Sequence, residues 1–250
     1  MIDDLLSLRV LVATRDEGLA NLFRQATSAS TVPVELVEVT DAATAQQSLE
    51  GADIAYIDGA LKPQEIAQIF SALRTLSKRP FSILLATAST AGKTFPTDGL
   101  AGKPSRIIES QWLLERSMRV RVPSRALVVD DSATMRMIVR KALAATRFQF
   151  HITEAEEGLA ALELVRNGEF DIVFLDYNMP GFSGLETLAE FKREKRRVSV
   201  VMITSVDDEA LAARVRALGA TFLKKPFFAA DIENALCSHY GLRALNPSRT

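Results

Sequence analysis

Two short stretches in the second half of the chain, residues 172–175 and 198–203, are almost continuously apolar. Strands of this kind are typical of a parallel sheet that has helices on both of its faces. A stretch with helical apolar periodicity lies between them, at 184–194, so strands and helices alternate along the chain. This alternation predicts an α/β fold with a doubly wound sheet.

The same alternation extends over the whole second half, from about residue 125. The expected strands are 126–129, 150–153, 172–176, 198–204 and 221–224. The expected helices are a first one around 135–143, followed by 158–167, 184–194, 208–218 and 229–240. The first helix is expected to carry apolar side chains on one face, at Met135, Ile138, Val139, Ala142 and Leu143.

The first half repeats this plan less regularly. Its expected strands are 9–13, 34–39, 54–58 and 81–86, and its expected helices are 17–29, 41–49, 64–76 and 105–118. Segment 87–104 is rich in Thr, Gly and Pro and has no apolar helical period, so we expect the fourth helix to be lost or shortened. The last helix has Ile107, Ile108, Trp112 and Leu113 at its apolar positions. We therefore expect two tandem domains, at 1–120 and 124–243.

Composition excludes several classes of protein. The 250 residues include 30 Lys and Arg against 31 Asp and Glu, so no overall field attracts nucleic acid or anionic lipid. The single cysteine, Cys237, excludes an internal disulfide, and with His151 and His239 it fits no metal spacing. The N-terminus is acidic, and no apolar run approaches the roughly 20 residues of a membrane span. We expect a cytoplasmic protein without a nucleic-acid partner or membrane insertion.

Polar residues follow or end four of the predicted strands in the second half. Asp130 and Asp131 follow the first strand, Asp176 ends the third, Thr204 ends the fourth and Lys225 follows the fifth. Because the carboxyl ends of parallel strands meet at one edge of the sheet, these residues are expected to share a pocket. An acidic pair alone is most often a turn or a helix cap. Its convergence with three other positions favours a functional site.

Such a pocket suits phosphoryl chemistry. Clustered carboxylates repel one another unless a cation lies among them, and hard oxygen ligands suit Mg²⁺. Asp131 and Asp176 would be the anionic ligands. Asp176 would attack an incoming phosphorus, as carboxylate nucleophiles do when they form aspartyl phosphates. Lys225 and the Thr204 hydroxyl would take the other phosphoryl oxygens.

Three segments carry a resemblance to a known family: 129–136 (VDDSATMR), 175–181 (LDYNMPG) and 225–227 (KPF). They resemble the CheY-like receiver domains of two-component response regulators, which have a flavodoxin-like (βα)5 fold. The resemblance implies a phosphoprotein with phosphoacceptor Asp176 and phosphate sensors Thr204 and Lys225. It also implies a Mg²⁺ held by Asp131, Asp176 and the backbone carbonyl of Asn178, with Asp130 acting through water.

The resemblance places Phe222 at the position of the family's switch aromatic, where CheY has a tyrosine. A phenylalanine in a strand is otherwise usually a core residue. Both interpretations of Phe222 stay open at the level of sequence.

The first half has a degraded version of the site. Alignment of the halves places Thr14 and Arg15 where the acidic pair should be, although Asp58 keeps the phosphoacceptor position and Lys103 the lysine position. We expect a degenerate pseudo-receiver without a metal site. One hypothesis is that the Arg15 guanidinium reaches Asp58 and replaces the cation. The alternatives are that Asp16 becomes a ligand, or that Asp58 is a structural carboxylate in an ion pair.

The resemblance implies a response regulator of a phosphorelay and no enzymatic turnover of an external substrate. Asp176 would accept a phosphoryl group from a histidine kinase or a histidine phosphotransfer protein and switch a surface that a downstream protein target reads. The first domain would serve as a docking or dimerising platform. A phosphorelay intermediate that passes phosphate onward is an alternative. A haloacid-dehalogenase-like phosphatase would need a second Asp two residues after the nucleophile, where this chain has Asn178.

Overall fold

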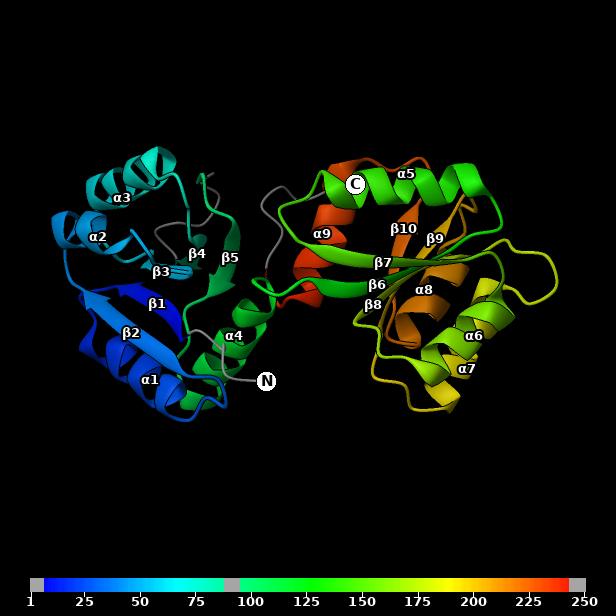
Figure 1. Cartoon of the computed structure of the whole chain (residues 1–250), viewed down its shortest axis with the longest axis horizontal. Coiled ribbons are helices and arrows are strands. Elements are labelled where there is room, and N and C mark those ends of the chain that lie inside the picture. Colours follow the sequence, from blue (N-terminus) through cyan, green and yellow to red (C-terminus); the bar gives the residue numbers. More distant parts are fainter. Residues whose placement is uncertain (1–6, 88–94, 243–250) are drawn as a thin grey trace. The chain divides into compact units, whose positions relative to one another are not determined.

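The computed structural model describes residues 7–87 and 95–242 of the 250. The chain divides into two compact units, of which the first comprises residues 7–121 together with 240–242 and the second comprises Val122–His239. Each unit contains one five-stranded parallel sheet with helices between its strands (Figure 1). The parallel α/β fold of both units agrees with the prediction, whereas the fifth strand of the first unit is not among the predicted strands. None of the described helices is long and apolar enough to cross a membrane.

The second unit has the strand order β10-β9-β8-β6-β7. Its strands are β6 (Ser124–Val129), β7 (Phe150–Ala155), β8 (Ile172–Asp176), β9 (Ser199–Thr204) and β10 (Thr221–Lys224). Its helices are α5 (Ala133–Ala144), α6 (Gly158–Asn167), α7 (Gly184–Arg193), α8 (Glu209–Ala217) and α9 (Ala229–His239). Helices α5 and α9 lie on one side of the sheet, and α6, α7 and α8 lie on the other (Figure 1). The strands and helices lie within two residues of the predicted ones.

Burial on both faces explains the apolar strands of this unit. All five residues of β8 are buried, and alternate side chains point to opposite faces. Val173 and Leu175 join the core cluster that includes Leu188 of α7 and Val215 of α8. Polar side chains cap the starts of α5, α7 and α8; at the start of α5 the Ser132 hydroxyl accepts a hydrogen bond from the backbone N–H of Met135.

The buried face of α5 agrees with the predicted one only in part: Val139 and Leu143 are buried as predicted, and Met135 and Ala142 are half-buried. Ile138 is 39% exposed, whereas Arg136, Val139 and Leu143 are buried. Ion pairs from Arg136 to the carboxylates of two glutamates hold its side chain against the unit. Hydrophobicity alone could not reveal this orientation, because the deciding residue is charged.

The first unit has the strand order β2-β1-β3-β4-β5. Its strands are β1 (Leu8–Ala13), β2 (Val34–Val39), β3 (Ile54–Asp58), β4 (Phe81–Ala86) and β5 (Gly99–Gly102). Its helices are α1 (Glu17–Ser28), α2 (Ala42–Ser48), α3 (Pro63–Thr75) and α4 (Ile107–Arg119). Strand β5 was not located from sequence, since Gly-Leu-Ala-Gly has little intrinsic strand preference. Pairing with β4 defines it, with Gly99 opposite Ile83 and Gly102 opposite Ala86.

The prediction of a lost or shortened fourth helix concerns the segment between β4 and β5. The described part of this segment, Thr87 and 95–98, contains no helix, and residues 88–94 lie outside the described part of the chain.

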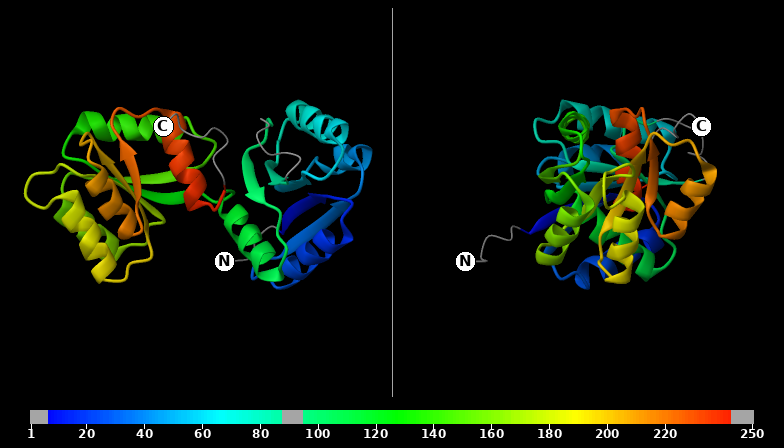
Figure 2. Two further views of the ribbon diagram at one scale, coloured as in Figure 1. Left: turned by 180° about the vertical axis from the view of Figure 1, so that it is seen from behind. Right: turned by 90° about the vertical axis from the view of Figure 1, so that its right-hand side faces the viewer.

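Helix α4 buries a different face from the predicted one. Of the four predicted apolar positions only Leu113 is buried; Ile107, Ile108 and Trp112 are 39%, 42% and 60% exposed. The helix lies beside α1 (Figures 1 and 2), and the Ser110 hydroxyl donates a hydrogen bond to the backbone carbonyl of Leu22. A small side chain permits this close approach, so a polar residue takes the buried position.

Candidate phosphoacceptor and metal site

The polar residues of the second unit are brought to one edge of the sheet by the register of its strands. Val129 at the end of β6 lies opposite Leu175, and Asp176 at the end of β8 lies opposite Ile203. Lys224 at the end of β10 lies opposite Thr204. The carboxyl ends of β6, β8, β9 and β10 are therefore level, and the residues that follow them surround one site.

Three carboxylates meet at this site. Asp130, Asp131 and Asp176 each offer an oxygen, and these oxygens all lie within 4.8 Å of one another. Asp130 and Asp176 are buried, each with 4% exposure, whereas Asp131 is exposed. Three like charges so close favour a cation among them, and oxygen donors with one side open to water match the preference of Mg²⁺. The residues present thus fit the predicted Mg²⁺.

Lys225 lies among these carboxylates. Its Nζ is 2.7 Å from Oδ1 of Asp176 and 3.2 Å from Oδ2 of Asp130. Burial raises the pKa of Asp176 above its usual value, even though the bond from Lys225 acts in the opposite direction. Burial lowers the pKa of Lys225, but its bonds to the two aspartates outweigh this effect, and the net shift is upward. The carboxylate cluster is therefore only partly neutralised by the protein itself.

Thr204 and Phe222 lie on neighbouring strands, with Thr204 at the carboxyl end of β9 and Phe222 two residues before the end of β10. The Thr204 side chain is fully buried, and its Oγ1 accepts a hydrogen bond of 3.0 Å from the backbone N–H of Val206. Phe222 on β10 is partly buried and packs against the core cluster. The backbone N–H of Lys225 donates to the carbonyl of Thr204 at 2.7 Å, which ties the lysine loop to β9.

Gly184 controls the loop after Asp176. Its backbone N–H donates to the carbonyl of Tyr177 at 3.1 Å, and a Cβ at this position would lie 2.1 Å from the backbone carbonyl oxygen of Asp176. Only glycine fits there, so the start of α7 can approach the end of β8 closely. Asn178, the predicted backbone ligand, is exposed in this loop, and a backbone hydrogen bond from it lowers the pKa of Asp176.

Asp58 has the corresponding position in the first unit and is also buried. Its carboxylate accepts a hydrogen bond of 2.7 Å from the Thr14 hydroxyl and one of 2.9 Å from the Lys103 ammonium. The backbone N–H of Ala60 donates to its other oxygen at 2.9 Å. Lys103 follows β5 as Lys225 follows β10, so the lysine position is retained. Within the described residues of this unit no group of three metal-ligating side chains comes together.

The hypothesis that Arg15 neutralises Asp58 is wrong. The Arg15 guanidinium lies 2.5 Å from Glu65 on α3 and donates to the carbonyl of Thr40, and its side chain is half exposed. Lys103 neutralises Asp58 instead. The interpretation of Asp58 as a structural carboxylate in an ion pair agrees with this arrangement.

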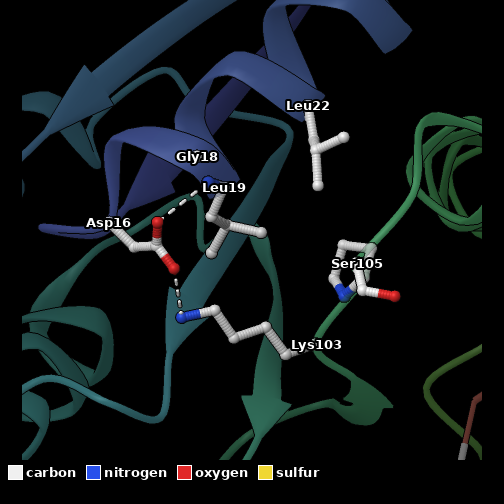
Figure 3. Close-up of a pocket in the computed structure, with 7 residues that line it drawn as sticks. Asp16, Gly18, Leu19, Leu22, Lys103 and Ser105 are labelled. Carbon is white, nitrogen blue, oxygen red and sulfur yellow. Dashed lines mark hydrogen bonds and ion pairs between the residues drawn. The ribbon is translucent and has the colours of Figure 1, made fainter.

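Asp16, the other alternative ligand, forms an ion pair with Lys103 and caps α1. Figure 3 shows its carboxylate between the Lys103 ammonium, 2.9 Å away, and the backbone N–H of Leu19, whose hydrogen bond caps α1. These residues line a pocket of about 500 Å³. Burial lowers the pKa of Lys103, but the bonds to Asp16 and Asp58 dominate together and raise it. Lys103 thus joins the two carboxylates.

Arg136 is a residue near the site to which sequence reasoning assigned no role. Its side chain is buried, and its Nη1 donates a hydrogen bond of 2.9 Å to the backbone carbonyl of Asp130. A sequence signal existed, since Arg136 stands three residues before Val139 on the buried face of α5.

Comparison with known proteins agrees with this geometry. A family model described as "Response regulator receiver domain" matches residues 126–237. Chemotaxis protein CheY-3 of Vibrio cholerae serotype O1 is 34% identical over 127 residues, which are 50% of this chain and 92% of that protein. Chemotaxis protein CheY of Bacillus subtilis is 31% identical over 113 residues, which are 45% of this chain and 93% of that protein. The chain belongs to the receiver-domain family of response regulators.

A solved structure of a "probable two-component system response regulator/GGDEF domain protein" aligns with this chain at a TM-score of 0.54 and 20% identity. The alignment covers 93% of this chain and 98% of the other chain. A second structure with a similar title has a TM-score of 0.51 and 18% identity over the same shares. At these identities the likeness concerns the fold alone, and it extends over both units. The prediction of two tandem receiver-like domains is confirmed.

Proposed function

We propose that Asp176 accepts a phosphoryl group from a phosphohistidine of a histidine kinase or histidine phosphotransfer protein, and that this changes a surface read by a downstream protein. The main support is the meeting of three carboxylates within 4.8 Å, with Lys225 bonded to one of them. If Lys225 and Asp176 formed only a structural ion pair, two further carboxylates beside them, one of them the exposed Asp131, would have no purpose.

The residues of the site divide the chemistry among them. Asp131, Asp176 and the backbone carbonyl of Asn178 would hold Mg²⁺, with Asp130 acting through water. When bound, this ion supplies charge neutralisation at the phosphoryl oxygens. The Asp176 carboxylate forms the new bond to phosphorus while the bond from phosphorus to the histidine nitrogen breaks. Lys225 and the Thr204 hydroxyl bind phosphoryl oxygens and so favour the charge that develops there.

The switch would pass from Thr204 to its neighbours. The hydroxyl that now accepts a bond from Val206 would turn to donate to the phosphoryl group, leaving space near β10. Phe222 would turn inward, which alters the surface formed by α8, β10 and α9. A partner that prefers the new state tenfold needs only about 1.4 kcal/mol of differential binding.

The first unit would be an inert receiver that docks or dimerises. Its phosphoacceptor position is occupied by contacts with Thr14 and Lys103. Arg15, at the position of a metal ligand, carries a positive charge, and among the described residues of this unit no three ligands come together as they do in the second unit.

Labelling with acetyl phosphate tests this function, followed by mapping of the acyl phosphate. We expect label on Asp176 only, and only with Mg²⁺ present. Asp176→Asn should lose the label, whereas Asp58→Asn, the matched change in the first unit, should keep it. Label that persists in Asp176→Asn, or in wild type without divalent metal, would contradict the proposal.

A further inference from the structure

Arg136 is a charged side chain on the buried face of α5, where it is only 7% exposed. Its guanidinium donates in three directions. Nε donates to Glu154 at 2.9 Å, Nη2 donates to Glu156 at 2.7 Å, and Nη1 donates to the backbone carbonyl of Asp130 at 2.9 Å. A planar guanidinium with donors fixed in a fork holds all three partners in one geometry.

The charge of Arg136 does not oppose a cation at the neighbouring site. A lone guanidinium behind the carboxylate cluster would repel a cation. Here two glutamate carboxylates contact it, and one of them, Glu154, is shared with Arg140 at 3.2 Å. The two arginines and two glutamates together therefore carry no net positive charge. What remains specific to Arg136 is its directed hydrogen bond to the Asp130 carbonyl.

Asp130 is held at each of its polar groups. Its backbone N–H donates to the carbonyl of Ala155, and its carbonyl accepts from Arg136. Its two carboxylate oxygens accept from the backbone N–H of Ser132 and from Lys225. Arg136 holds the carbonyl of Asp130, and this carbonyl is part of the peptide unit that joins Asp130 to Asp131.

The peptide between Asp130 and Asp131 is planar, so its orientation determines where the Cα of Asp131 lies. Asp131 is the exposed member of the cluster, and nothing in its own burial holds it in place. We propose that Arg136 is a positioning residue for the cation site: its bond to the Asp130 carbonyl fixes this peptide and so holds the Asp131 carboxylate against Asp176. This inference rests on the proposed function, because it assumes that the cluster binds Mg²⁺.

The competing explanation is that Arg136 only fastens α5 to β7. The two explanations differ in one measurable quantity, the Mg²⁺ affinity of protein that is fully folded. A fastening role lowers thermal stability and leaves that affinity unchanged. If Arg136 is a positioning residue, its loss weakens Mg²⁺ binding. Loss of residues that orient metal ligands typically lowers metal affinity about 10- to 100-fold.

The experiment is a calorimetric titration of the full chain with MgCl₂, at a temperature where circular dichroism shows each variant to be folded. We expect the dissociation constant to rise at least about tenfold in Arg136→Met. Arg136→Lys keeps the positive charge but lacks the forked guanidinium, so it should also bind Mg²⁺ more weakly than wild type. If Arg136→Met does not fold, the Mg²⁺ affinity of Arg136→Lys is the deciding measurement.

Three controls separate the explanations. Val139→Ala, on the same buried face, should lower the melting temperature without changing Mg²⁺ affinity. Arg140→Met removes a cation from Glu154 but no bond from Asp130, and Glu156→Gln removes an ion pair from Arg136 but keeps its bond to the carbonyl. Both keep the bond to the Asp130 carbonyl and change the charge of the group by one unit in opposite directions, so neither should weaken Mg²⁺ binding as much as Arg136→Met does.

Wild-type affinity in folded Arg136→Met or Arg136→Lys, alongside lost binding in Asp131→Asn, would overturn the role of Arg136 and leave the proposed function standing. Failure of the wild-type chain itself to bind Mg²⁺ would overturn both.

Discussion

The Nζ atom of Lys225 lies 2.7 Å from Oδ1 of Asp176, yet the pKa of Asp176 is raised above its usual value. Burial of the carboxylate exceeds the effect of its bond to the lysine, and the nearby charge of Asp130 adds to the shift. A raised folded-state pKa means that the folded chain holds this proton more tightly than the unfolded chain does. The ionised form of Asp176 therefore costs stability at neutral pH, as functional carboxylates often do.

Asp176→Asn should consequently stabilise the second unit in the absence of Mg²⁺. The expected gain at pH 7 is roughly 0.5–2 kcal/mol, because the uncharged amide removes the cost of the buried charge. Because the pKa of Asp176 is higher in the folded chain, its ionisation begins to destabilise the wild-type fold only as pH rises above the unfolded-state value of 3.8. The stability gained by Asp176→Asn should therefore fade below that pH. Calorimetry of the full chain at pH 3.5 and pH 7 without metal measures it. A loss of stability at pH 7 would contradict the prediction.

Lys103 should stabilise the first unit by neutralising Asp58 and Asp16. Lys103→Met should lower the free energy of unfolding by about 1–3 kcal/mol, because the buried Asp58 loses its charged donor. The raised pKa of Lys103 means that its contribution is complete below the unfolded value of 10.5 and is lost as pH rises through the folded pKa. Denaturant melts between pH 8 and pH 11 test this. Lys103→Met combined with Asp58→Asn should recover part of the loss, and simple additivity of the two changes would refute the coupling.

Restoring the acidic pair should create a Mg²⁺ site in the first unit. The change is Thr14→Asp with Arg15→Asp, made in a chain with Asp131→Asn and Asp176→Asn so that the second unit contributes no site. We expect Mg²⁺ binding to appear, because carboxylates would replace a hydroxyl and a cation beside Asp58. Arg15→Gln in the same background removes the cation without adding a ligand and should not bind. Binding in the unmodified first unit, with an affinity like that of the second, would show that it is no pseudo-receiver.

Thr204→Ala should leave Asp176 phosphorylatable but uncouple it from the surface formed by α8, β10 and α9. The physical reason is that only the hydroxyl can exchange its bond with Val206 for one to the phosphoryl group. Amide exchange across 208–239, with and without beryllofluoride, measures the coupling. Thr204→Ser keeps the hydroxyl and should respond like wild type. Equal responses in wild type and Thr204→Ala would refute the coupling.

Gly184→Ala should damage the site by a purely steric route. The added Cβ would lie 2.1 Å from the Asp176 carbonyl oxygen, so the strand end or the start of α7 must move. We expect a loss of about 1–3 kcal/mol and slower labelling of Asp176. Gly181→Asn, in the same loop, is the matched control: Gly181 has φ of 75°, which asparagine tolerates, and open space where a Cβ would be. Equal effects of the two changes would contradict the steric explanation.

Regular elements and the central site were predictable from sequence because their signals are local. Strand β8 is apolar along its length, and its final residue, Asp176, lies where the predicted strand ends. The convergence of Asp130, Asp131, Asp176 and Lys225 followed from the level carboxyl ends of a parallel sheet, and their carboxylates and ammonium do meet. Their roles in phosphoryl transfer stay predictions until the labelling is done.

Tertiary structure decided the partners of long charged side chains and the orientation of helices. Arg15 pairs with Glu65, and Lys103, rather than Arg15, pairs with Asp58, since ion pairs across 45 or more residues depend on where separate elements lie. Trp112 is exposed and Ser110 buried because close packing of α4 on α1 outweighs the hydrophobicity of single residues. Sequence thus determined which strands and polar residues build the site, through periodicity and parallel pairing. Contacts between distant elements determined which charges neutralise one another, because no local pattern encodes them.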